Sequence, residues 1–105
     1  MSRVVKNNLS FLHLLATCPA HQKQILLESA TPEQVHAMVQ AAHNIYRGYV
    51  PLTPAEKEAL MPYKESIQEL QDPSASFRTK KRIIVQEGGS FIPDLLLPLL
   101  TTLLL

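Results

Sequence analysis

Cysteine and histidine are the side chains in this sequence that could act as metal ligands. Cys18 and His21 have C-x-x-H spacing, and His36 and His43 lie two turns apart on one predicted helix. Structural zinc requires four deprotonated nitrogen or sulfur ligands held tetrahedrally, and this spacing is not that of a known zinc finger. The simpler interpretation is that Cys18 is a small buried residue and the histidines lie at the surface. We therefore expect no metal site and no cofactor.

Nucleophilic catalysis is the second chemistry that Cys18 could support. A catalytic thiolate must be exposed, activated and close to an oxyanion site. The sequence has no Gly-rich loop and no orienting carboxylate near Cys18, and its one glycine pair, Gly88-Gly89, has no lysine after it to bind phosphate. We therefore predict that the protein is not an enzyme, has no catalytic residues and takes no small-molecule substrate.

A basic run precedes the glycine pair and consists of Arg78, Lys80, Lys81 and Arg82. Such a run can bind the phosphates of DNA, because each neutralised phosphate releases counterions. The same cations could contact anionic lipid heads if the chain lies on a membrane surface. They could also form an ordinary solvated helix face. The sequence leaves these three interpretations open.

The chain ends in an apolar tail, residues 88–105, which holds eight leucines and no basic residue. On a helix that begins at Pro93, most of the leucines form one broad apolar arc, while Asp94, Pro98, Thr101 and Thr102 form a narrow opposite face. A membrane span needs about 20 apolar residues, so the shorter, proline-interrupted tail predicts an amphipathic helix. The residues expected to dock on a partner or membrane surface are Phe91, Ile92, Leu95, Leu96, Leu99, Leu100 and Leu103. The alternative, that the tail folds back and completes the core of the domain, is equally compatible with the pattern.

The segments that position these features are all predicted to be helical. We expect the fold class to be all-α, a compact bundle of about five short helices with an amphipathic leucine-rich C-terminal helix. Residues 1–6 are predicted to form a loose arm, and residues 9–17 an apolar, buried helix capped by Asn7 or Asn8. The break at Cys18-Pro19 starts a second helix, which is expected to bury Ile25, Leu26 and Leu27.

Two threonine-proline pairs mark the next helix starts. Thr31 and Thr53 each begin a capping box with proline at the first helical position. The first of these helices carries Val35, Met38, Val39, Ala42, Ile45 and Tyr46 on one apolar stripe and ends at Gly48 in a left-handed cap. The second is predicted to bend at Pro62. Ser74 or Ser76 is predicted to cap the last helix of the domain, with its basic residues outward and Phe77 on its apolar side.

Length and composition indicate a single domain. The chain has 105 residues and a formal net charge of +1, with an acidic excess over residues 20–75 and a basic excess over residues 77–87. We divide it into a helical domain, residues 1–87, and a glycine hinge with the hydrophobic tail, residues 88–105. The single cysteine excludes an internal disulfide, and the N-terminus lacks the features of a secretory signal. We expect an intracellular protein that is not secreted.

The tail resembles a known viral pattern. The segment GGSFIPDLLLPLL, residues 88–100, resembles the end of the adenovirus minor core precursor family, protein X. The upstream segments FLHLLATCPAHQKQILLES and GYVPLTPAEKEAL, with a basic run before a glycine pair, resemble small proteins encoded by Maverick/Polinton transposons and adintoviruses. The second resemblance covers nearly the whole chain.

The resemblance implies a virion-associated, non-enzymatic accessory protein located in the host nucleus and the virion. Its expected partners are a capsid or core protein, or another copy of itself, bound through the tail, with DNA and peripheral membrane contact as alternatives. Adenovirus relatives pack DNA and lose a hydrophobic tail by proteolysis, which implies a processing site at Gly88 and Gly89. The proteases concerned favour an aliphatic residue two places before the glycine pair, and this chain has Gln86 there. A membrane-active tail masked by the helical domain is a third functional alternative.

Overall fold

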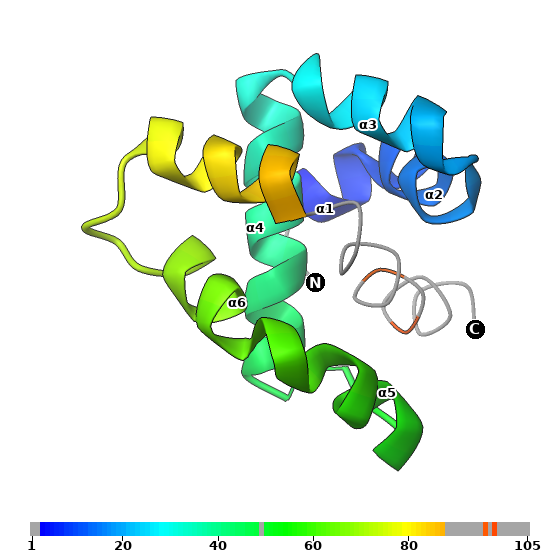
Figure 1. The fold of residues 1–105 in the computed structure, drawn as a ribbon, viewed down its shortest axis with the longest axis vertical. Helices are drawn as coiled ribbons and strands as arrows, with labels where there is room; N and C mark the ends of the chain where they lie inside the picture. Colours follow the sequence, from blue (N-terminus) through cyan, green and yellow to red (C-terminus); the bar gives the residue numbers. More distant parts are fainter. Residues whose placement is uncertain (1–2, 49, 88–95, 97, 99–105) are drawn as a thin grey trace.

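The computed structural model describes residues 3–48, 50–87, 96 and 98 (Figure 1). These residues form an all-α bundle in which no strand occurs among the described positions. The Cα radius of gyration is 12.4 Å, close to the roughly 13 Å expected of a compact domain of about 100 residues. The predicted fold class is therefore confirmed.

The N-terminal segment is a helix, and the prediction of a loose arm is wrong. Helix α1 (Arg3–Asn7) packs against α4 and buries Val5 completely. A short turn at Asn8 separates α1 from α2 (Leu9–Thr17), where the Asn8 side chain donates from Nδ2 to the carbonyl oxygen of Val4 at 2.8 Å. Asn8 is thus the N-cap residue, but its side chain bonds back to α1 and not to the first amides of α2.

Helices α2 and α3 bury less of their apolar surface than predicted. Leu12 and Leu15 are fully buried in α2, whereas Leu14 is exposed on the outer side. The chain turns at Cys18 and Pro19 into α3 (Ala20–Glu28), as predicted. In α3 only Leu27 is fully buried, and Ile25 is 60% exposed. The rotation of such short helices is set by the neighbours against which they pack, which local spacing does not reveal.

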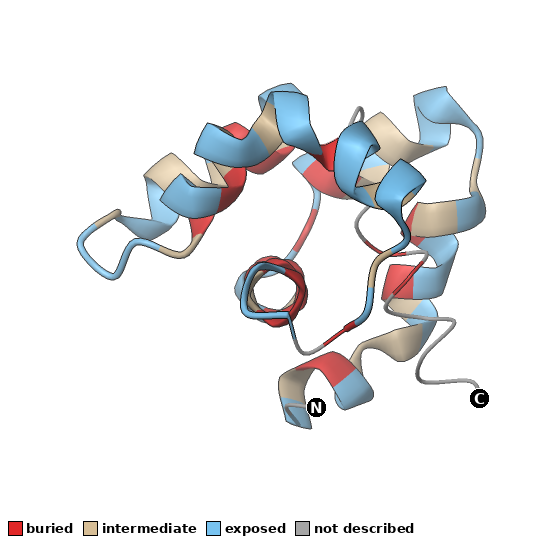
Figure 2. Ribbon diagram, turned by 90° about the horizontal axis from the view of Figure 1, so that it is seen from below, coloured by how far each residue is buried: buried red, intermediate tan, exposed pale blue. Residues whose placement is uncertain are grey.

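Helix α4 (Pro32–Tyr46) is the central element of the bundle. Figure 2 looks along α4 and shows other helices placed around it. Its predicted capping box is present: Thr31 Oγ1 accepts from the amide of Gln34 at 3.2 Å, and Gln34 Oε1 accepts from the amide of Thr31 at 2.9 Å. Gly48 follows with φ of 78°, the left-handed conformation that glycine adopts without strain.

The burial of α4 exceeds the one apolar stripe that the sequence indicates. Ala37, Ala41 and Asn44, spaced by four and three, form a second buried stripe. Small side chains at two of these positions allow a neighbouring helix to approach closely. Tyr46, predicted to lie on the buried stripe, is half exposed.

The second capping box begins a bent segment of the bundle, residues 54–70, which we call the bent arm. Thr53 caps α5 (Pro54–Leu60), which continues through the 3-10 helix Met61–Tyr63 into α6 (Lys64–Leu70). The bend lies at Pro62 as predicted, because proline removes a backbone donor there. Leu60, Ile67 and Leu70 face inward and are buried.

The tail contributes to the domain core at the positions that the structure describes. Leu96 is fully buried and belongs to the same apolar cluster as Met38 and Leu70, and Pro98 is buried as well. Both residues are helical. At Leu96 and Pro98 the tail therefore packs onto the domain itself.

Candidate nucleic-acid interface

The basic run lies on the helix of residues 77–87, whose start is fixed by two local hydrogen-bonded motifs. Ser76 Oγ accepts from the amide of Thr79 at 3.2 Å, so Ser76 is the cap. Just before it, Asp72 Oδ1 accepts from the hydroxyl of Ser74 at 2.7 Å and from the amide of Ser74 at 2.9 Å. These bonds, the hydroxyl first, lower the pKa of Asp72 below its usual value, with a smaller contribution from the charge of Lys80.

The inner side of this helix anchors it to the bundle. Ile83 and Ile84 are buried in the core. Near the end of the helix, Gln24 Nε2 donates to the carbonyl oxygen of Val85 at 3.2 Å, and Ser66 Oγ donates to Glu87 Oε2 at 2.6 Å. The helix is therefore held by α3 on one side and α6 on the other, and Arg78, Arg82 and Gln86 are exposed on its outer face.

The four predicted cations do not share one environment. Arg78 and Arg82 are exposed, and neither guanidinium group has a hydrogen bond or ion pair to another described residue. Lys80 and Lys81 are half-buried. Lys81 Nζ donates to the carbonyl oxygen of Ala30 at 2.9 Å, at the end of α3, so this lysine also ties the helix to the bundle. The prediction that the basic residues face outward holds for the two arginines only.

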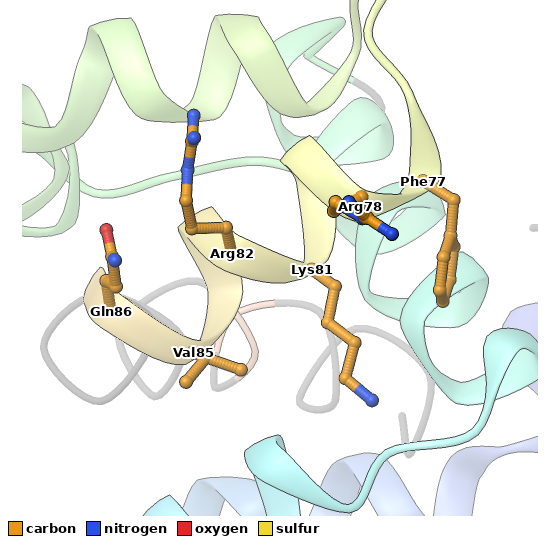
Figure 3. Close-up of a pocket in the computed structure, with 6 residues that line it drawn as sticks. All are labelled: Phe77, Arg78, Lys81, Arg82, Val85 and Gln86. Atoms are coloured by element: carbon orange, nitrogen blue, oxygen red, sulfur yellow. The ribbon is translucent and has the colours of Figure 1, made fainter.

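An open groove of about 490 Å³ lies along the outer face of the helix (Figure 3). We call it the basic groove, and its lining residues are Phe77, Arg78, Lys81, Arg82, Val85 and Gln86. Among the described residues, three cations and no carboxylate line it. Figure 3 shows Lys81 and Val85 on one side of the helix and Arg82 and Gln86 on the other, so the cations are spread along the face and do not converge on a point. Such a spread suits an extended anion better than a single small one. Lys80 lies elsewhere, in a smaller depression that it lines with His36 and Val39.

Phe77 is a residue of the basic groove whose position differs from the sequence prediction. The sequence predicts Phe77 on the apolar inner side, but the residue is 48% exposed and lies at one end of the basic groove (Figure 3). Exposed aromatic rings beside cations provide flat surfaces for sugars or bases in proteins that bind nucleic acids. The four-residue spacing from Phe77 to Lys81 was the available signal, because residues four apart share a helix face.

The predicted docking surface of the tail is described at a single position. Leu96 is buried within the domain, as expected at that residue if the tail folds back onto the core. Pro98, assigned to the narrow polar face, is buried too. The other predicted docking residues and the predicted processing site lie outside the described residues: Phe91, Ile92, Leu95, Leu99, Leu100, Leu103, Gly88 and Gly89.

The remaining chemistry-bearing residues are scattered over the bundle. Cys18 is half-buried, and its Sγ donates to the carbonyl oxygen of Leu15 at 4.0 Å. Over the described part of the chain, no three histidine, cysteine or carboxylate side chains gather in a way that could hold a metal ion. No helix within that part is long and apolar enough to cross a membrane.

Comparisons with protein-family models, with curated proteins and with solved structures found no match to this chain. The fold and the basic groove therefore rest on the geometry of this molecule alone.

Proposed function

We propose that the protein is a non-enzymatic DNA-binding protein that contacts the phosphate backbone through the basic groove. The observation that carries the proposal is the pair Arg78 and Arg82, exposed one helical turn apart and unpaired within the described structure. Arginine guanidinium groups bind phosphate through two parallel hydrogen bonds, which gives both charge and geometry.

The spacing of the two arginines supports an anionic partner. Residues four apart on a helix have Cβ atoms about 6 Å apart, and like charges at that spacing destabilise a helix by roughly 0.2–0.5 kcal/mol. No carboxylate among the described residues of the groove offsets this repulsion. Phosphates bound between the two guanidinium groups would remove it. Lys81 adds a third cation, although its bond to Ala30 leaves it less available.

The biological setting of the proposal comes from the sequence resemblance. Similarity to proteins of Maverick/Polinton elements and to an adenovirus core precursor suggests a minor core protein of a virus-like element, acting in the host nucleus and the virion. With a net charge of only +1, the chain is suited to local backbone contacts and not to condensing DNA. The hypothesis of an external docking tail has less support, because Leu96 lies in the core of the domain.

A salt titration tests the proposal. Binding of the full chain to a fluorescently labelled DNA duplex is measured by anisotropy at increasing sodium chloride concentrations. Three phosphate contacts give a slope of log K against log salt of about −2.7, since each contact contributes about −0.9. The double variant Arg78→Gln/Arg82→Gln should flatten the slope to about −0.9.

A variant of equal charge provides the control. Arg3→Gln/Arg47→Gln removes two exposed arginines from outside the basic groove, so it changes the net charge by the same amount. We expect it to keep the slope of the unmodified chain. Equal loss of binding in both double variants would show that only net charge matters, and the assignment of the basic groove would then be wrong.

A further inference from the structure

A second groove opens on another part of the bundle, where the bent arm meets α4. This apolar groove has a volume of about 280 Å³ and an almost wholly carbon lining. The described residues that line it include Tyr46, Lys57, Leu60, Met61, Lys64 and Ile67, and no carboxylate is among them. It shares no residue with the basic groove. We propose that it binds an acidic amphipathic helix of a partner protein.

The register of the arm creates the groove. Lys57, Leu60, Met61 and Lys64 follow one another at spacings of three, one and three, so they share one face of the arm across the bend at Pro62. Apolar side chains therefore occupy the middle of this face and one lysine stands at each end. This is the pattern of a groove that accepts the apolar side of a helix along its length.

Two side chains in the walls of the groove differ in character: Tyr46 is held by a hydrogen bond, and Met61 is flexible and exposed. Gln68 Nε2 donates to the hydroxyl oxygen of Tyr46 at 3.2 Å, which holds the half-exposed ring against α6. Met61 is 64% exposed, the largest fraction among the big apolar residues of the described chain. Unbranched methionine adapts its shape to different partners and is common on helix-binding surfaces.

Charge complementarity selects the occupant. Lys57 and Lys64 are exposed, and neither side-chain ammonium group has a hydrogen bond or ion pair to another described residue. They lie seven positions apart in the sequence, about 10–12 Å along a helix that includes a 3-10 turn. Carboxylates seven residues apart on a partner helix have nearly the same separation. The proposed partner is therefore a helix with two carboxylates seven residues apart and with apolar residues between them, one turn from each carboxylate.

A designed peptide tests this proposal on the full chain. The probe is a fluorescein-labelled helical peptide with two adjacent leucines placed between glutamates seven residues apart. Two control peptides carry glutamine or lysine in place of both glutamates. We expect micromolar binding of the glutamate peptide, several-fold weaker binding of the glutamine peptide and no binding of the lysine peptide. Equal binding of all three would overturn the charge argument, and no binding of the glutamate peptide would overturn the proposal.

Protein variants locate the binding. Lys57→Glu/Lys64→Glu should weaken the glutamate peptide at least about tenfold, because two attractive pairs become repulsive. Met61→Asp should also weaken binding of the glutamate peptide, because the substitution removes an apolar contact with the leucines of the peptide. Lys6→Glu reverses the charge of an exposed lysine on α1, outside the groove, and as a control should leave the affinity unchanged. Circular dichroism and thermal unfolding confirm that each variant is folded, and a loss of binding in a folded Lys6→Glu variant would contradict the location.

Two further measurements distinguish a partner helix from two other occupants of the groove, a second copy of the chain and a lipid surface. Sedimentation of the chain without peptide reports self-association, and a dimer that Met61→Asp dissociates would mean that a second copy fills the groove. Anionic phosphatidylserine vesicles that displace the peptide would indicate a lipid occupant. Either result would overturn the proposal of a partner helix. DNA binding by Arg78 and Arg82 is measured independently, so each proposal can fail without the other.

Discussion

Helix α4 and the helix of residues 77–87 both begin at a hydroxyl N-cap, but they differ sharply in how much of their surface the fold covers. Eight of the 15 residues of α4 are buried, on two stripes. In residues 77–87 only Ile83 and Ile84 are buried, and the outer face carries exposed arginines. The same capping chemistry thus starts a helix of the core and a helix of the surface.

The difference teaches which sequence feature decides the role of a helix in this protein. Caps fix where a helix begins, because they satisfy the first backbone amides locally. The number and spacing of apolar residues decide how deeply it is buried. Small residues such as Ala37 and Ala41 extend the burial of α4 to a second face, whereas Arg78 and Arg82 keep one face of the other helix in water.

The largest effect in this comparison is expected from the core of α4. Met38 is fully buried in the apolar cluster, so Met38→Ala removes packing and leaves a cavity. We expect the free energy of unfolding to fall by about 2–5 kcal/mol, measured by urea denaturation followed by circular dichroism. Met61→Ala is the control, because Met61 is mostly exposed, and it should change the stability by less than about 0.5 kcal/mol. Equal effects from both variants would contradict the central position of α4.

A smaller effect is expected from the two caps. Thr31→Ala removes the acceptor for the Gln34 amide and should lower the free energy of unfolding by about 1 kcal/mol. Ser76→Ala removes the corresponding acceptor for the Thr79 amide. Because the helix of residues 77–87 is less buried than α4, we expect its first turn to fray before the bundle unfolds. Amide hydrogen exchange should show faster exchange at residues 79–81 in Ser76→Ala, and faster exchange spread over α4 would argue against this distinction.

Local features of the fold could be predicted from the sequence. The capping boxes at Thr31 and Thr53, the glycine cap at Gly48 and the turn at Asp72 all depend on residues within four positions of each other. Their hydrogen bonds join residues that are close in sequence, so the local residue types indicate them. The basic run was also visible, because charge needs no tertiary context.

Features that depend on distant partners could not be predicted. Val5 is buried because α1 packs against α4, and the short sequence around it carries no helical period. Lys81 donates a hydrogen bond to Ala30, which lies 51 positions earlier in the sequence. This contact holds Lys81 against the bundle, whereas Arg78 and Arg82 of the same basic run are exposed. The exposure of Ile25 and Phe77 follows from the rotation of their helices against the core. The apolar groove requires α4 and the bent arm to meet, so no linear pattern marks it.

Mapping the DNA contact on the protein tests the central claim most directly. The full chain, labelled with ¹⁵N, is titrated with a short DNA duplex at low salt, and the amide shifts are followed by NMR. We expect the largest shifts at Phe77, Arg78, Arg82 and Gln86, which line the basic groove, and small shifts over α4. Shifts centred on another surface, or no shifts at all, would contradict the assignment of DNA binding to residues 77–87.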